Sequence, residues 1–380
     1  MKRIRIILGV LLFAVLGSAL FLAARAAAFV LPVQDFAQYW AAAHLIAKNP
    51  YSLQQVTAFE MCRNLNVASP MVMRNPPWAL VFVLPFCHFS YQTAFGLWAI
   101  FSVVAVTGCA RAAWRLCTPE PSTAPALLSL LFGPTVALLT LGQFAVLVLL
   151  GITIFLVMID RNRDWLAGAA LLFISVKPHV ALLFLLAIGL WTVQAKRWRV
   201  LLSAATMVAI ASVIVVAINP DIFKQYVEFA KQFTSETTPY PNLGGELYVL
   251  FGHHSLAYLP QICGILWLLW YWRRNRSTWN WKTHGMITLV ASVACSYYSF
   301  GFDEIVILPA LMAAFSGGAR GIFLTGFIAT NLGYAIYISG IARNLIRGPQ
   351  FLFWTSTAWL LTYCLSRRSD SWSSKAPLAN

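Results

Sequence analysis

The sequence predicts an all-α membrane protein that crosses the bilayer many times. Hydrophobic residues make up 60% of the 380-residue chain and charged residues only 10%, whereas soluble domains carry roughly a quarter charged residues. Apolar stretches long enough to span a bilayer recur along the whole length. Lys and Arg gather in short clusters between those stretches, which is typical of cytoplasmic loops. We therefore expect about 12 transmembrane helices, within a range of about 10–13.

The net charge of +15 does not indicate a nucleic-acid partner. The basic residues stand in separate clusters at the ends of apolar runs, as membrane topology requires. The 15 Trp and 13 Tyr also suit a chain surrounded by lipid, since both side chains favour the headgroup region. We expect membrane lipids around the protein and no nucleic acid bound to it.

The first apolar segment has two interpretations. Three basic residues near the N-terminus precede an apolar run from Ile6 to Leu22, and an Ala-rich stretch follows. This arrangement is typical of a signal peptide with a small-residue cleavage site. It also fits a retained first membrane helix, Ile6–Phe29, which we favour. In either case the residues that follow are delivered outside the cytoplasm.

The remaining spans are assigned from apolar runs, and their sides are assigned from the basic clusters. Thr93–Ala110, for example, returns to the cytoplasm at Arg111 and Arg115. The short, Pro-bounded run Pro77–Phe89 is interpreted as a partial or re-entrant element. The later predicted spans are Ala124–Leu141, Phe144–Ile159, Trp165–Val176, Val180–Val193, Val200–Ile218, Leu256–Trp272, His284–Tyr298, Ile305–Phe315, Ile322–Ile341 and Phe351–Leu365. This alternation places both termini in the cytoplasm.

We expect one transmembrane domain over residues 1–366, with outer loops at about 31–75 and 219–255. The Ser-rich segment 367–380 is expected to be a disordered cytoplasmic tail. Within the first outer loop, Asp35–Lys48 has no Pro or Gly and is predicted to form a short amphipathic helix. Its apolar stripe would be Phe36, Trp40, Ala43 and Ala47 at helical spacing.

Polar residues collect on the outer side of this topology. Ionisable groups beside membrane helices are costly, so they mark candidate functional sites. The residues concerned are Asp35, Tyr39, Arg74, Asn75, Gln143, Lys177, His179, the 219–255 loop, Asp303 and Glu304.

Structural roles compete with functional ones at each of these positions. Asp35 at a helix start can cap backbone N–H groups. Lys177 can extend to the headgroups or hold a phosphate as a point charge. The prolines after Arg74-Asn75 can serve only to end the loop and begin the next element. The acidic pair Asp303-Glu304 and the aromatic residues before it can be interfacial.

Several classes of chemistry have no support in the sequence. There is no Walker A loop, no Gly-x-Gly-x-x-Gly fingerprint after a strand and no His-Glu-x-x-His motif. The seven Cys show neither a Cys-x-x-Cys pair nor a disulfide framework. No Asp-x-Asp pair of the kind that holds a metal and a nucleotide sugar is present. We expect no cofactor and no metal.

Short motifs in the chain resemble those of glycosyltransferase family 87, over roughly Asp35 to Leu308. Each motif is only a few residues long, but all occur in the family's order and on one predicted side. They are Asp35-Phe36-Ala37-Gln38-Tyr39, Asn49-Pro50-Tyr51, Arg74-Asn75-Pro76-Pro77, Leu84-Pro85, Gly142-Gln143, Ala167-Gly168, Lys177-Pro178-His179, and Ser296 with Tyr297 or Tyr298 and Asp303.

The resemblance implies a fold of the GT-C class and a polyprenyl-phosphate sugar as the donor, with mannose the most usual sugar. Transfer to a glycolipid or glycan acceptor would occur with inversion, on the outer side of the cytoplasmic membrane. Asp35 would be the general base, and Lys177, His179 and Arg74 would bind the donor phosphate. Substrate contacts would come from Tyr39, Asn75, Gln143, Tyr298 and Asp303.

Two departures from the family pattern leave alternatives open. Asn242-Leu243-Gly244-Gly245 stands where Asn-Gln-Ser is usual, which puts acceptor contacts in doubt. Arg74 replaces a more usual aromatic residue. A secondary transporter is one alternative, although such proteins often show internal repeats and charges at the midplane. A non-catalytic partner in envelope glycan assembly is another.

Overall fold

The computed structural model describes residues 35–63, 65, 71–233, 240–317, 320–342 and 349–373. These residues form helices and contain no strand, which confirms the all-helical prediction for the described part of the chain. The first predicted span, Ile6–Phe29, lies outside the described residues. The chain divides into two compact units. The first unit comprises residues 1–105, 139–143 and 208–236, and the second comprises residues 106–138, 144–207 and 237–380. The assignment of a single domain stays a prediction.

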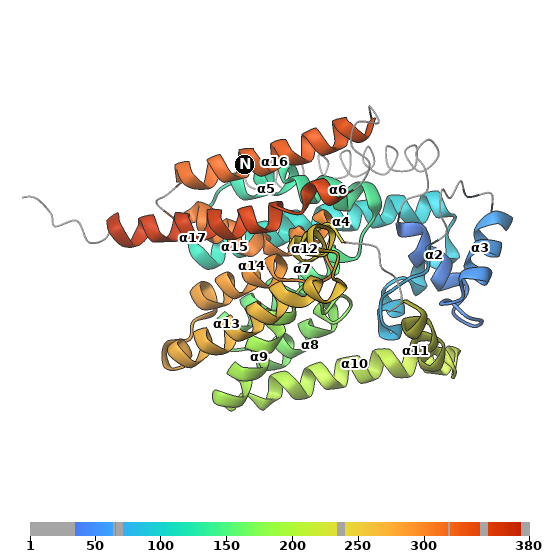
Figure 1. The fold of residues 1–380 in the computed structure, drawn as a ribbon. Coiled ribbons are helices and arrows are strands. Elements are labelled where there is room, and N and C mark those ends of the chain that lie inside the picture. The colour runs from blue at the N-terminus through green and yellow to red at the C-terminus, as the bar shows by residue number, and fades with distance from the viewer. Residues whose placement is uncertain are drawn as a thin grey trace, which may run out of the picture. The chain divides into compact units, whose positions relative to one another are not determined.

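The first unit contains two short helices from the segment predicted to be the first outer loop (Figure 1). Its elements are α2 Phe36–His44, α3 Leu53–Cys62, the 3-10 helices η1 Pro77–Phe82 and η2 Leu84–His88, the first part of α4 Tyr91–Cys117, the last part of α10 Trp198–Ile218, and α11 Ile222–Phe233. The predicted partial element over residues 77–89 is thus two short 3-10 helices, with a proline in the first turn of each.

Helix α2 differs from its prediction because it is buried well beyond one stripe. Tyr39 is 1% exposed, and Ala41 and Ala42 are fully buried, although none of them belongs to the predicted apolar face. Rings from η2 and α4 surround Phe36, and its centroid lies 5.6 Å from that of Trp98. The sequence pattern missed this because neighbouring elements cover the remaining faces. Helix α11, in the segment predicted to be the second outer loop, is amphipathic, with Ile222 buried and Lys224 and Glu228 exposed.

The second unit holds the remaining helices. They are α5 Ala124–Leu131, α6 Gly133–Leu141, α7 Ala145–Asp160, α8 Asp164–Ile174, α9 Leu182–Gln194, α12 Leu243–Phe251, η3 His254–Tyr258, α13 Leu259–Asn275, η4 Arg276–Thr278, the π-helix η5 Trp281–Gly285, α14 Met286–Ala294, η6 Gly301–Ile307, α15 Leu308–Ser316, α16 Arg320–Ala342, η7 Pro349–Leu352 and α17 Thr355–Ser373. The last three residues of α6 belong to the first unit. Helix α17 continues past the predicted end of its span at Leu365.

Close helix contacts in this unit depend on small residues. A Cβ added at Gly168 of α8 would lie 2.2 Å from the carbonyl oxygen of Val200, and one at Gly151 of α7 would lie 2.8 Å from that of Ala170. Small residues let helix backbones approach closely where no hydrophobic effect drives association. The Ala167-Gly168 motif is therefore explained by packing.

The described helices include few that are individually long enough to cross a membrane. α4 and α10 qualify by length and composition, and α5 with α6 forms a broken pair bent by 63° that could count as a third. Helices α7, α8 and α9 are apolar but shorter. These findings fit a membrane protein, whereas the count of about 12 spans stays a prediction.

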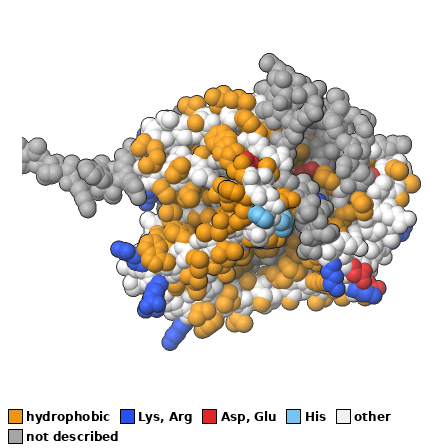
Figure 2. Space-filling model, in the orientation of Figure 1, with side chains coloured by type: hydrophobic (Ala, Val, Ile, Leu, Met, Phe, Trp, Pro, Cys, Tyr) orange, Lys and Arg blue, Asp and Glu red, His pale blue; other side chains and the backbone are white. Residues whose placement is uncertain are grey.

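The exposed surface of the second unit has the composition expected in lipid. Leu266 and Trp270 of α13 and Ile328 of α16 are more than half exposed, and contiguous apolar surface of this kind marks contact with a membrane or a partner. Figure 2 shows hydrophobic side chains over α13, with Lys and Arg side chains at the ends of α9 and α13. The basic residues of the last turn of α13 are Arg273 and Arg274.

Candidate active site

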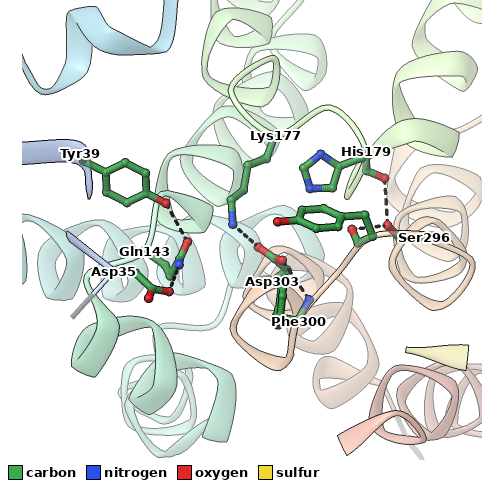
Figure 3. Close-up of polar contacts among 9 residues, drawn as sticks. Asp35, Tyr39, Gln143, Lys177, His179, Ser296, Phe300 and Asp303 are labelled. Atoms are coloured by element: carbon green, nitrogen blue, oxygen red, sulfur yellow. Dashed lines mark hydrogen bonds and ion pairs between the residues drawn. The ribbon is translucent and has the colours of Figure 1, made fainter. Parts of the chain in front are cut away.

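Asp35 stands directly before α2, but its carboxylate does not cap the helix. The residue has helical dihedral angles, and its side chain makes no capping hydrogen bond. Instead Oδ2 accepts a hydrogen bond from Nε2 of Gln143 (Figure 3). The hydroxyl of Tyr39 donates to Oε1 of the same Gln143 over 3.0 Å. The amide thus orients the carboxylate, and the helix-cap interpretation finds no support in this geometry.

Gly142 brings Gln143 to this position. Its φ is +69°, a left-handed conformation that costs other residues about 1–2 kcal/mol. A Cβ added there would lie 2.7 Å from Cβ of Phe36 and 3.0 Å from the ring of Phe95. The Gly142-Gln143 motif therefore combines a turn only glycine makes easily with an amide that reaches Asp35.

We expect Gly142→Ala to lower the free energy of unfolding by at least about 1–2 kcal/mol, because strain and overlap with Phe36 add together. Chemical denaturation in detergent measures this loss. Gly108→Ala is the matched control, since Gly108 lies within α4 and a Cβ there meets nothing within 4 Å. That control should stabilise the protein by roughly 0.5–1 kcal/mol. Equal effects at the two positions would contradict the argument.

The Asn49-Pro50-Tyr51 and Arg74-Asn75 segments meet in the first unit. The hydroxyl of Tyr51 donates to the backbone oxygen of Asn75 over 3.0 Å. Its ring packs on Tyr226 and Phe229 of α11, with centroids 5.2 and 5.9 Å away. Asn75 is 6% exposed, and Arg74 is exposed. Tyr51 therefore joins the two segments that were predicted to be outer loops, and its hydrogen bond uses only the main chain of Asn75.

In the second unit, Lys177 is held inside the protein. Its Nζ lies 2.8 Å from Oδ1 of Asp303, and the two residues are 7% and 0% exposed. Oδ2 of Asp303 accepts the backbone N–H of Phe300 over 3.1 Å (Figure 3). The ammonium also lies 4.8 Å from the ring centroid of Phe302, a favourable cation–π contact. The interpretation of Lys177 as a side chain extending to the headgroups is therefore wrong.

His179 lies in the turn between α8 and α9, and its ring packs edge-on against Tyr298 with centroids 4.8 Å apart. Ser296 Oγ lies within hydrogen-bond distance of the backbone oxygens of His179 and Tyr298, at 3.2 and 2.9 Å. Burial, and then the charge of Lys177, lower the pKa of His179 to about 3. This pKa favours a neutral imidazole at pH 7 in the protein without donor, in which His179 would offer hydrogen bonds and not a positive charge.

Glu304 was one of the outer polar residues noted in the sequence but received no role there, and among the described residues of the second unit it is the most enclosed carboxyl group after Asp303. It is 4% exposed in η6, where Oε2 accepts from Tyr334 Oη and from Trp359 Nε1, both over 3.1 Å. Its Oε1 lies 2.5 Å from Oγ1 of Thr355. The only signal in the sequence was an acidic residue next to an apolar run.

Counting protons indicates that Glu304 is protonated. Oγ1 of Thr355 also lies 2.7 Å from the carbonyl oxygen of Leu352, which can only accept. The hydroxyl of Tyr334 likewise has a second acceptor, the carbonyl oxygen of Gly301 at 2.9 Å. These two hydroxyl protons face four acceptor oxygens, so a proton on Glu304 that is donated to one of the hydroxyl groups reduces the shortage of donors. Burial acts in the same direction and raises the pKa of Glu304 to about 8.

We expect this carboxyl group to make stability fall as pH rises. Its folded pKa lies above the ordinary value of 4.5, so the folded state holds a proton that the unfolded state releases between pH 4.5 and 8. The stabilisation is complete below pH 4.5 and is lost as pH rises to about 8. In Glu304→Gln the unfolding midpoint should depend less on pH across this window than it does in the wild type, because the amide does not titrate. A parallel decline in both proteins would contradict the assignment.

The fold and these two polar clusters are those of a helical protein that fits a membrane and holds buried polar groups between its helices. Residues 74–296 match the model of glycosyltransferase family 87. Because that match covers more than half of the chain, the chain belongs to this family, as its motifs predicted, and is a membrane glycosyltransferase. No curated protein and no solved structure matches it.

The family match places the candidate residues in two groups. Arg74, Asn75, Gln143, Lys177 and His179 lie within it. Four others fall outside it, namely Asp35, Tyr39, Tyr298 and Asp303. In each unit a residue inside the matched range contacts one outside it, since Gln143 donates a hydrogen bond to Asp35 and Lys177 pairs with Asp303.

Proposed function

We propose that this protein transfers a sugar, most simply mannose, from a polyprenyl-phosphate donor to an acceptor hydroxyl. Transfer takes place on the extracytoplasmic side of the cytoplasmic membrane, with inversion at the anomeric carbon. The observation that carries this proposal is the Asp35 carboxylate, which Gln143 and Tyr39 orient although the helix beside it does not use it as a cap. Family membership supports the reaction class.

In the proposed reaction, Asp35 accepts the proton of the acceptor hydroxyl while that oxygen attacks the anomeric carbon. The bond from that carbon to the phosphate oxygen breaks, and polyprenyl phosphate leaves with the bonding pair. Only one group therefore has to move a proton, and a positioned carboxylate typically contributes about 10²–10⁴-fold. The Gln143 amide donates to the carboxylate and so favours its ionised form.

The departing phosphate needs positive charge more than an acid, because it is already a good leaving group. Fixed charges and dipoles aimed at developing negative charge stabilise a transition state. We assign this role to Lys177, which Asp303 orients, with the exposed Arg74 as a second cation. His179 is neutral and contributes hydrogen bonding only. No cofactor enters the proposal.

The donor and the side of the membrane can be tested together. Right-side-out and inverted membrane vesicles containing the protein are supplied with radiolabelled polyprenyl-phosphate mannose or with a nucleotide-activated mannose, and labelled glycan is measured. We expect transfer from the lipid-linked donor alone, to acceptors on the extracytoplasmic face. Vesicles lacking the protein are the control. Transfer that requires the nucleotide sugar, or that labels only the cytoplasmic face, would overturn the proposal.

A further inference from the structure

A cavity of about 400 Å³ opens in the first unit beside the C-terminal end of α2. It is lined by Trp40 and His44 of α2, by Arg63 and Leu65 after α3, and by the segment Cys87–Gln92, which runs from the end of η2 into α4. Its volume lies within the range of about 300–1,000 Å³ that is usual for small-molecule sites. The proposed reaction assigns no role to any of these residues, so the cavity requires an explanation of its own.

Three rings packed at tilted angles form one wall of the cavity. The Trp40 and His44 rings lie 4.3 Å apart, and Phe59 of α3 packs behind both, at 5.4 and 5.1 Å. The indole N–H of Trp40 donates to the backbone oxygen of Phe89 over 3.1 Å, which joins α2 to the opposite wall. The Phe89 ring is 42% exposed. A rigid aromatic surface beside polar groups suits a ligand with both C–H and hydroxyl faces.

The wall carries the positive charge of Arg63. Arg63 and His88 are exposed, and the guanidinium of Arg63 is held 5.4 Å from the Phe59 ring centroid. Among the described residues that line the cavity, none is acidic. Arg is the side chain best matched to carboxylate and phosphate, because its planar fork binds two oxygens at once. The cavity is therefore complementary to an oxyanion.

His44 adds a neutral acceptor to this wall. Its Nδ1 lies 3.0 Å from the backbone oxygen of Trp40, which can only accept, so Nδ1 carries a proton. Burial, with smaller effects from the charges of Arg63 and His88, lowers the pKa of His44. A neutral ring protonated at Nδ1 has a lone pair at Nε2, which can accept a hydrogen bond from a sugar hydroxyl.

The position of the cavity along α2 suggests which substrate it serves. Trp40 follows Asp35 by five residues and His44 follows it by nine, which places the wall about 8–14 Å along the helix axis from the base. A group bound there cannot be the reacting hydroxyl, but it can be another part of the same acceptor. This step rests on the proposed function of Asp35.

We propose that the cavity binds an anionic sugar residue of the acceptor, carrying a carboxylate or a phosphate group. Arg63 and His88 contact the anion, His44 and Gln92 contact hydroxyl groups, and the exposed Phe89 ring covers a C–H face. Acceptors with this group are held by two points, the reacting hydroxyl at Asp35 and the anion at Arg63.

Binding tests the inference without any sugar transfer. Full-length protein in detergent is titrated calorimetrically with mannose, mannose 6-phosphate and glucuronate. At least one anionic sugar should bind about 10-fold or more tightly than mannose, a difference of roughly 1.4 kcal/mol, and the tighter of the two identifies the anion. Arg63→Gln and His88→Gln should each remove that preference, with unchanged thermal unfolding. Arg161→Gln, at an exposed arginine of the second unit, should keep it.

The outcomes separate this inference from the proposed function. The inference would be overturned if mannose and both anionic sugars bound equally tightly. It would also be overturned if Arg63→Gln and Arg161→Gln lost the preference for the anionic sugar to the same extent. Neither result would bear on the transfer reaction. Asp35→Asn should retain anion binding and lose transfer. Anion binding by a wild-type protein that transfers no sugar would keep the site but remove its assignment to an acceptor. In a protein that does transfer sugar, the tighter anionic sugar should also compete with the natural acceptor.

Discussion

Asp35→Asn is expected to lower the rate of sugar transfer by about 10²–10⁴-fold, the contribution of one positioned general base. The amide is nearly isosteric and stays beside Gln143, but it cannot accept the proton of the acceptor hydroxyl. Initial rates with saturating lipid-linked donor measure the effect at equal protein levels. The loss should appear in kcat, because the base acts in the transition state.

Controls distinguish chemistry from folding at this position. Asp160→Asn alters a carboxylate in the second unit that pairs with Lys282 at 2.7 Å near the surface, and it should leave transfer unchanged. Gln143→Ala keeps the base but removes the amide that orients it, so it should lower the rate by less than Asp35→Asn does. Transfer that survives in Asp35→Asn would show that another group takes the proton.

Lys177→Met is expected to destabilise the protein by about 3–5 kcal/mol, because it leaves the buried Asp303 carboxylate without its ion-pair partner. The free energy of unfolding, measured by denaturant titration in detergent, should recover in the double variant Lys177→Met/Asp303→Asn. That variant has no buried charge in the pair, and the amide oxygen introduced by Asp303→Asn can still accept the N–H of Phe300, as the carboxylate does.

Transfer activity in the same variants separates structure from catalysis. If Lys177 stabilises the leaving phosphate, the double variant should unfold like the wild type yet transfer sugar at least about 10-fold more slowly. Full activity in a stable double variant would show that the ion pair only holds η6 in place. Single variants as stable as the wild type would contradict the buried-pair argument itself.

The comparison of sequence and structure is clearest at Asp35. The sequence singled this residue out, because a carboxylate next to a membrane helix is costly and has to be explained. The sequence left the helix cap and the base as equal alternatives. The structure argues against the cap, since the carboxylate bonds Gln143, which is 108 residues away and reaches Asp35 through the left-handed turn at Gly142, whereas the role of general base stays a prediction.

Lys177 and Glu304 show the same limit. Both belong to polar segments that the sequence assigned to the outer side, yet their surroundings were not predictable. Lys177 turns inward because Asp303, 126 residues away, offers it a charge. Glu304 is enclosed by groups from α16 and α17. Local patterns report which residues are unusual, but burial and pairing depend on segments remote in the chain.

The sequence by itself determined the all-helical class, the membrane environment and the family, because these depend on composition, hydrophobic run length and short ordered motifs. Tertiary structure decided that α2 is enclosed on nearly all sides, that His179 is neutral and that an anion-complementary cavity lies beside Trp40. These properties arise where rings, charges and backbone oxygens from different segments meet. The energies of desolvation and of charge pairing depend on contacts between segments that are far apart in the chain, so no local sequence pattern encodes them.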